Sequence, residues 1–106
     1  LPSDAFEFEA SELVGDNLLV TVSYGGGCAV HEWTLCWGGF FAESEPVQAT
    51  LELIHDANGD DCLAALVQEL TLDLLPLQDA WHASYGPGAG TILVHLVGDE
   101  LHSYSF

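Results

Sequence analysis

Apolar and polar residues alternate along several short segments of the chain, a pattern typical of half-buried β-strands. The clearest alternation covers residues 6–10, 20–24, 30–40 and 47–55, and further strands are expected at 70–74, 91–97 and 101–106. Glycine, proline and acidic residues separate these segments and predict turns. Seven or eight short strands predict an all-β fold, a single immunoglobulin-like β-sandwich domain over residues 1–106, with a barrel as the alternative.

Three segments carry other signals. Leu77, Trp81 and Tyr85 recur at the i, i+4 spacing of a helix and predict one short helical turn after Pro76. Residues 62–67 fit either a strand or a helix, because their apolar positions satisfy both periods. The run Gly25-Gly26-Gly27 predicts a loop or a bulge.

Residues 30–40 and 47–55 are expected to form an antiparallel hairpin about the turn Glu43–Pro46. His31, Trp33, Leu35 and Trp37 share one face of the first strand, which we assign to the core. This pairing gathers notable side chains at one end of the domain. They are Cys28 and His31 from one side, and His55, Asp56, Asn58, Asp60, Asp61 and Cys62 from the other.

Charge distinguishes this chain more than any motif. It has 106 residues, 49% of them hydrophobic, which is enough for one core without a structural metal. It has 17 acidic residues and no Lys or Arg, although average usage would give roughly a dozen basic side chains. Nucleic acid and anionic membranes are therefore disfavoured as partners, and cations are favoured. No apolar run reaches the roughly 18 to 20 residues of a membrane span.

The three cysteines predict one disulfide, between Cys28 and Cys62. The closed loop would stabilise the fold by roughly 4 kcal/mol on the chain-entropy relation. A bridge between Cys28 and Cys36 is the alternative, but a straight strand would hold these two residues too far apart. Cys36 is then a free thiol or forms an intermolecular bridge, and the disulfide predicts an extracellular or cell-surface location.

His31 and His55 point to the same face of the expected hairpin, and two interpretations stay open. In the first, both are inward-facing histidines whose hydrogen bonds are satisfied at the edge of the core. Alternatively, the two imidazoles bind Cu or Zn, with Asp56 or Asp60 as an oxygen ligand. Residues 56–61 also match the start of a calcium loop, but Asp61 replaces the required Gly, so Ca is the weaker prediction.

Several of these residues form a pattern. Gly26-Gly27-Cys28 followed by His31, a Ser44-x-Pro46 turn, and then His55, Asn58, Asp60 and Cys62 resembles a pattern in uncharacterised secreted or lipoprotein-type bacterial domains. The resemblance covers residues 24–77, about half of the chain. It implies an exported, cysteine-bridged β domain and no established activity. Cys36 and the lack of basic residues are not part of it.

No motif for nucleophilic, metal-dependent or phosphate chemistry occurs, so we expect a protein that is not an enzyme. The leading hypothesis is a non-catalytic structural or interaction module of a cell surface or extracellular filament. Its partner would be a second copy or another surface protein, bound by strand addition at the terminal strands, which carry Phe6, Phe8, Tyr104 and Phe106. The alternatives are the Cu or Zn protein and a domain whose acidity serves solubility alone.

Overall fold

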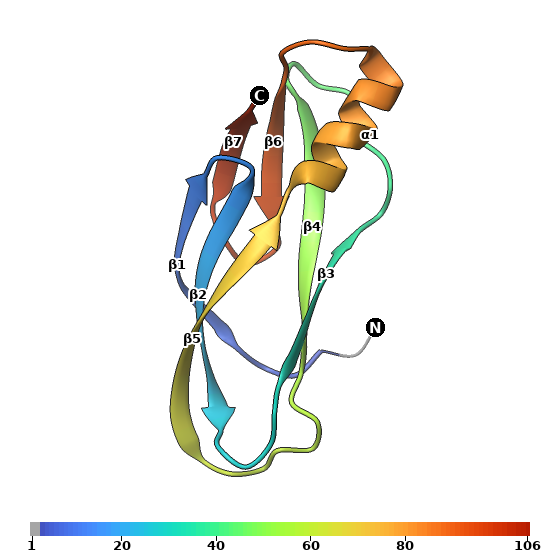
Figure 1. Ribbon diagram of the computed structural model, residues 1–106. Helices are drawn as coiled ribbons and strands as arrows, with labels where there is room; N and C mark the ends of the chain where they lie inside the picture. Colours follow the sequence, from blue (N-terminus) through green and yellow to red (C-terminus); the bar gives the residue numbers. More distant parts are fainter. Residues whose placement is uncertain (1–2) are drawn as a thin grey trace.

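The computed structural model describes residues 3–106 as two packed β-sheets and one helix (Figure 1). The strands are β1 (Glu7–Val14), β2 (Asn17–Gly26), β3 (Glu32–Trp37), β4 (Val47–Asp56), β5 (Ala64–Asp73), β6 (Thr91–Leu96) and β7 (Leu101–Ser105). The helix α1 spans Leu75–Tyr85. Seven strands in two sheets with one short helix confirm the predicted all-β sandwich.

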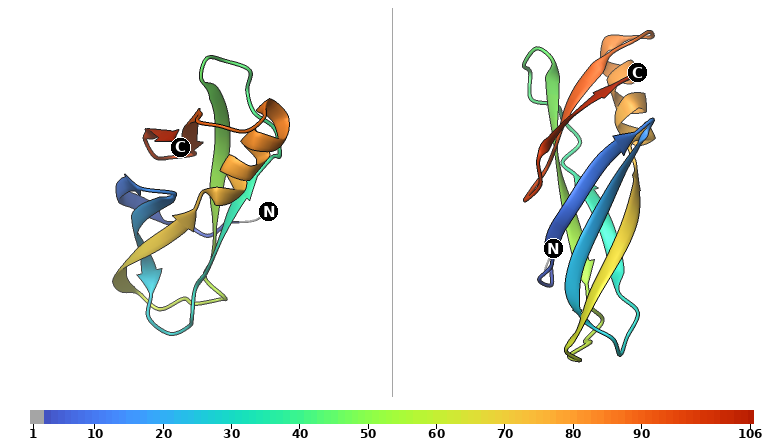
Figure 2. Two further views of the ribbon diagram at one scale, coloured as in Figure 1. Left: turned by 45° about the horizontal axis from the view of Figure 1, so that its top comes forward. Right: turned by 90° about the vertical axis from the view of Figure 1, so that its left-hand side faces the viewer.

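The strand order is β1-β2-β5 in the first sheet and β3-β4-β6-β7 in the second. All neighbouring strands run antiparallel except β4 and β6, which pair in parallel. This one parallel pair differs from the fully antiparallel immunoglobulin sandwich. The molecule is elongated, with extents of 48 × 24 × 18 Å, and the long strands β2, β4 and β5 run along its length (Figures 1 and 2).

The core lies between the sheets and follows the alternation in the sequence. Leu18, Val20 and Val22 of β2 are fully buried, and so are Ile92, Val94 and Leu96 of β6. The intervening residues face outward, as the pleat of a strand requires. The hydrophobic effect acting on these alternating positions therefore fixes which face of each sheet is inside.

The predicted hairpin is correct. Strand β3 pairs antiparallel with β4, with Trp33 opposite His55 and Leu35 opposite Leu53. Trp33, Leu35 and Trp37 pack against the core, as expected for that face. The turn between the strands contains a cis peptide bond between Glu45 and Pro46.

The structure corrects one local prediction and decides between the two alternatives left open by another. Gly25 and Gly26 belong to β2 and pair with Ala65 and Ala64, so only Gly27 of the glycine run lies in the loop. The ambiguous segment after Cys62 is not helical, because β5 begins at Ala64 and pairs with β2 over ten residues. Cross-strand pairing thus decides between the two periods that the segment satisfies.

The helix α1 is longer than the predicted turn but carries the predicted face. Pro76 lies in its first turn, where a missing N–H costs nothing, and Leu77 is buried. Trp81 packs edge to face against Phe106, and Tyr85 lies against Phe41. The helix therefore covers one end of the sandwich (Figure 1). None of the described helical segments is long and apolar enough to cross a membrane.

The charge of −17 predicts a strong salt dependence of stability. The Debye length is about 30 Å at 0.01 M salt, comparable with the width of the molecule, and about 3 Å at 1 M. We expect the free energy of unfolding in urea to rise as NaCl is added over this range at pH 7. At about pH 3, where most carboxyl groups are protonated, the gain should shrink. An equal gain at both pH values would contradict a Coulombic origin.

Candidate functional site

The loops β2–β3 and β4–β5 meet at one end of the sandwich, here called the disulfide pole and defined by residues 27–31 and 57–63 (Figure 1). A disulfide joins Cys28 to Cys62 there, with the Cα atoms 5.9 Å apart. The predicted bridge is therefore confirmed, and the alternative bridge to Cys36 is excluded. Cys36 is a free, half-buried thiol on β3. A disulfide of this kind indicates a location outside the cytoplasm.

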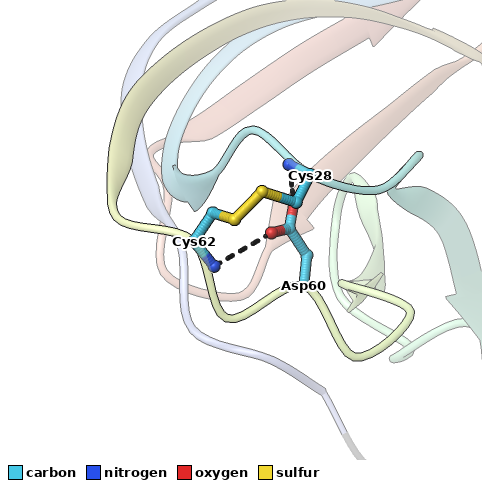
Figure 3. Close-up of side chains that lie close together, drawn as sticks. All are labelled: Cys28, Asp60 and Cys62. Carbon is cyan, nitrogen blue, oxygen red and sulfur yellow. Dashed lines mark hydrogen bonds between the residues drawn. A yellow bond between two sulfur atoms is a disulfide. The ribbon is translucent and has the colours of Figure 1, made fainter.

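The Asp60 carboxylate lies inside the loop that the disulfide closes (Figure 3). Its Oδ2 accepts hydrogen bonds from the backbone N–H groups of Gly27 (2.9 Å), Cys28 (3.1 Å) and Ala29 (3.1 Å). Its Oδ1 accepts a hydrogen bond from the backbone N–H of Cys62 (3.1 Å). Three successive N–H groups around one oxygen form an anion-binding nest. One side chain thus fixes the backbone on both sides of the disulfide.

Two histidines extend this arrangement into the core. His31 Nε2 lies 2.8 Å from Asp60 Oδ2, and His31 Nδ1 lies 2.7 Å from His55 Nε2. His55 Nδ1 lies 3.2 Å from the backbone oxygen of Ala5. The side chains of His31 and Asp60 are almost fully buried, and so is His55. The hydrogen bond from His31, together with the backbone N–H groups, outweighs burial and holds the pKa of Asp60 well below its usual range.

The polarity of these contacts assigns the protons. A carbonyl oxygen only accepts, so His55 Nδ1 carries a proton toward Ala5. A carboxylate also only accepts, so His31 Nε2 carries a proton toward Asp60. One further proton lies between His31 Nδ1 and His55 Nε2. From these contacts we infer three protons on the four ring nitrogens, which corresponds to one positive charge on the histidine pair opposite the Asp60 carboxylate.

Aromatic rings enclose the histidine pair. Trp33 stacks on His55 with ring centroids 4.1 Å apart and an interplanar angle of 7°. Tyr24 lies against His31 at 4.6 Å and donates a hydrogen bond from its hydroxyl to Gln68 Oε1. The indole Nε1 of Trp33 is buried without a hydrogen-bond partner among residues 3–106. Ring packing, and not a hydrogen bond of its indole N–H, therefore positions Trp33.

Gly26 makes room for the His31–Asp60 pair. A Cβ at this position would lie 2.6 Å from His31 Nε2 and 2.7 Å from Asp60 Oδ2. Both distances are far shorter than any normal contact with a carbon atom. The last residue of β2 must therefore be glycine for its sterics, and a positive φ angle is not the reason.

The structure brings together some of the predicted metal ligands. His31, His55 and Asp60 converge, whereas Asp56 Oδ1 accepts a hydrogen bond from the backbone N–H of Asn58 and closes a local turn. The convergent histidines have one ring-nitrogen lone pair left, on the nitrogen that accepts their shared proton. A Cu or Zn ion would have to displace protons and replace these hydrogen bonds.

The spacing of potential ligand atoms also indicates that a metal ion would have to replace existing bonds. Within residues 3–106, the one group of three that could surround an ion is Cys28, Asp60 and Cys62. The two sulfur atoms in that group are bonded to each other, so neither is a thiolate ligand. In the run 56–61, which matches the start of a calcium loop, both oxygens of Asp60 accept hydrogen bonds from backbone N–H groups.

A second histidine contact lies between the sheets. Ser11 Oγ is 2.8 Å from His102 Nε2, and Asp99 Oδ2 is 3.6 Å from the same nitrogen. In a catalytic triad the serine and the carboxylate contact opposite ring nitrogens. This arrangement therefore joins β1 to β7 and does not have the geometry of a serine hydrolase.

Sequence reasoning found the members of the cluster that carry chemistry and missed those that shape it. The sequence patterns assign no contact with the histidines to Tyr24, Gly26 or the backbone oxygen of Ala5, and they do not predict Asp60 as an acceptor for backbone N–H groups. A glycine directly before a loop with Cys and His is the one signal that could have pointed to close packing at Gly26.

The fold, but not the sequence, is similar to solved structures. The chain matches no protein-family model and no curated protein. A NigD-like immunity protein from Bacteroides caccae superposes with a TM-score of 0.68 at 15% identity, covering 100% of this chain and 55% of that one. A protein of unknown function (DUF1344) from Bacteroides vulgatus gives 0.56 at 17%, covering 98% and 48%. The chain thus spans about half the length of both proteins, and the likeness defines a shared β-sandwich fold.

The steric role of Gly26 can be tested with two neighbouring alanines. We expect Gly26→Ala to lower the free energy of unfolding by about 1–3 kcal/mol, because its methyl group overpacks a buried ion pair. Gly25→Ala is the matched control, since a Cβ there meets nothing within 4 Å, and it should change stability by less than about 0.5 kcal/mol. Urea unfolding measures both. Equal effects would refute the close approach.

The low pKa of Asp60 predicts a pH-dependent contribution to stability. The folded state keeps Asp60 ionised more strongly than the unfolded chain does, so its contribution is complete above about pH 4 and is lost as pH falls further. Asp60→Asn should therefore be clearly less stable than the parent at pH 7, and the difference should narrow between about pH 4 and pH 2. The exposed neighbour Asp61→Asn is the control and should not be destabilised at pH 7. A pH-independent difference for Asp60→Asn would contradict this assignment.

Proposed function

We propose that the protein is a non-catalytic, extracellular interaction module that joins a second copy or another surface protein by strand addition. The observation that carries the proposal is the position of the terminal strands. Both β1 and β7 lie at sheet edges, each with one neighbouring strand. An edge strand presents unpaired backbone N–H and C=O groups, to which a further strand can pair.

The aromatic side chains in and directly next to these strands face the core. Tyr104 is fully buried, and Phe6, Phe8 and Phe106 pack against the core. They anchor the two edge strands in the core, so the backbone of each strand would make the contact with an added strand. Strand addition would therefore depend on backbone pairing and on the outward residues, such as Val14 of β1 and Leu101 of β7, which are half-exposed.

The chemistry of the disulfide pole agrees with a binding role. The polar atoms of Asp60, His31 and His55 are engaged with one another or with backbone groups, which leaves no nucleophile or open ligand position in that cluster. One solved structure with this fold is a NigD-like immunity protein, and at 15% identity the likeness is one of fold, so the function is argued from the site itself.

Binding of Cu or Zn stays the second candidate, favoured by the convergence of His31 with His55. It requires both imidazoles to lose the shared hydrogen bond. Calorimetric titration of the dialysed protein with Zn²⁺ decides the matter: tight, stoichiometric binding that disappears in His31→Ala would support this function. Weak, non-stoichiometric uptake on the acidic surface would not.

Sedimentation velocity tests the strand-addition proposal. Because self-repulsion opposes contact, we expect association that increases with protein concentration and with added NaCl or Ca²⁺. Val14→Glu combined with Leu101→Glu should weaken association at least tenfold by placing charges on the two edge strands. Phe40→Glu combined with Val97→Glu adds the same charge at exposed positions off these strands and should change it less. A monomer under all these conditions would overturn self-association, and equal effects of both pairs would overturn its assignment to β1 and β7.

A further inference from the structure

A shallow hollow of about 500 Å³ lies beside the disulfide pole. Its walls come from the end of β2, the start of β5 and the segment that leads into β1. Tyr24, Leu66 and Val67 line it, together with Leu63, which follows the disulfide-bonded Cys62. The hollow is separate from the buried histidine cluster, although Tyr24 borders both.

Two large aliphatic side chains of this hollow are unusually exposed. Leu63 has 96% of its surface accessible and Val67 has 70%, whereas the core leucines are almost completely buried. Scattered apolar residues are normal on a surface, but two that line the same hollow form an apolar patch. Burial of this patch by a partner would recover hydrophobic free energy that the isolated chain leaves unused.

The backbone beside the hollow has an unpaired edge. Strand β1 pairs with β2 only as far as Ser23, which lies opposite Glu7. Strand β2 continues through Tyr24, Gly25 and Gly26, which among residues 3–106 pair only with β5. Before Glu7 the chain crosses to the other sheet, where the Asp4 N–H donates to the His55 carbonyl. The β1 side of Tyr24 and Gly25, which both line the hollow, is therefore available to an extended segment from another molecule, whereas Gly26 is buried.

Charge decides which occupant fits. Glu7 lines the hollow, and Glu9 accepts a hydrogen bond from Ser23 Oγ (2.6 Å) at its border. The chain has no Lys or Arg to balance these carboxylates, and a second copy would add another 17 acidic residues. A segment with aliphatic side chains on one face and Lys or Arg on the other complements both the apolar patch and its acidic border.

We propose that this hollow docks an extended segment of a different protein, in which aliphatic residues alternate with Lys or Arg. The segment pairs its backbone with residues 24 and 25, places an aliphatic side chain against Leu63 and Val67, and directs its cations toward Glu7 and Glu9. This inference rests on the proposed function as an interaction module and assigns it a partner surface other than the edges of β1 and β7.

A titration followed by amide NMR shifts tests this site. The probe is a synthetic peptide of alternating valine and lysine, and the control peptide carries serine in place of valine. We expect saturable shifts at residues 24, 25 and 63–67 with the valine peptide only. Leu63→Ser combined with Val67→Thr should weaken the dissociation constant at least tenfold. Both positions are exposed, so the variant should stay folded. Phe40→Ser, equally exposed in the β3–β4 loop, is the control and should leave binding unchanged.

Other outcomes would overturn the proposal. Saturable shifts confined to β1 or β7 would move the partner to the strand edges and leave the proposed function intact. Equal shifts with both peptides, spread over the acidic surface, would reduce the contact to non-specific charge attraction. Shifts at residues 24 and 25 that grow with protein concentration alone would identify a second copy as the occupant. Sedimentation of the protein without peptide separates these failures from a failure of the proposed function.

Discussion

The disulfide pole depends on one buried ion pair, formed by the charged histidine pair and the Asp60 carboxylate. The segments that meet there have little regular secondary structure, so tertiary contacts must hold them. Asp60 reaches the backbone on both sides of the disulfide, and His31 connects that carboxylate to His55 in the core. A buried charge is expensive unless it is paired and hydrogen-bonded, so loss of one member would leave the others uncompensated.

The composition of the chain restricts which side chains can form such an ion pair. In a chain without Lys or Arg, histidines are the only side chains that can supply a buried cation. The register of the β3–β4 hairpin places Trp33 opposite His55, and the two rings stack. His31, two residues before Trp33, then lies next to the His55 ring. Gly26 allows the final approach. The absence of Lys and Arg also leaves the surface acidic, because the chain cannot balance its own carboxylates. The basic partner proposed for this surface follows from that charge.

Local patterns in the sequence predict much of the fold. Alternation identifies the core faces of β2, β3 and β4, and the break at Glu43–Pro46 identifies the hairpin that brings Cys28 close to Cys62. Contacts between distant segments were not predictable in this way. The parallel pairing of β4 with β6 depends on a crossover, and the start of β5 fits two periods until β2 pairs with it. The proton count of the histidine pair needs the Ala5 carbonyl, which no sequence pattern places next to His55.

The state of the histidine pair is tested most directly by side-chain ¹⁵N NMR at neutral pH, which distinguishes protonated from unprotonated ring nitrogens. The network predicts protons on His55 Nδ1 and His31 Nε2, and a third proton shared by the two facing nitrogens. Three protons on four nitrogens, reduced to fewer in Asp60→Asn, would establish the buried cation. Two protons on the pair, unchanged in Asp60→Asn, would contradict the ion pair on which the account of the pole depends.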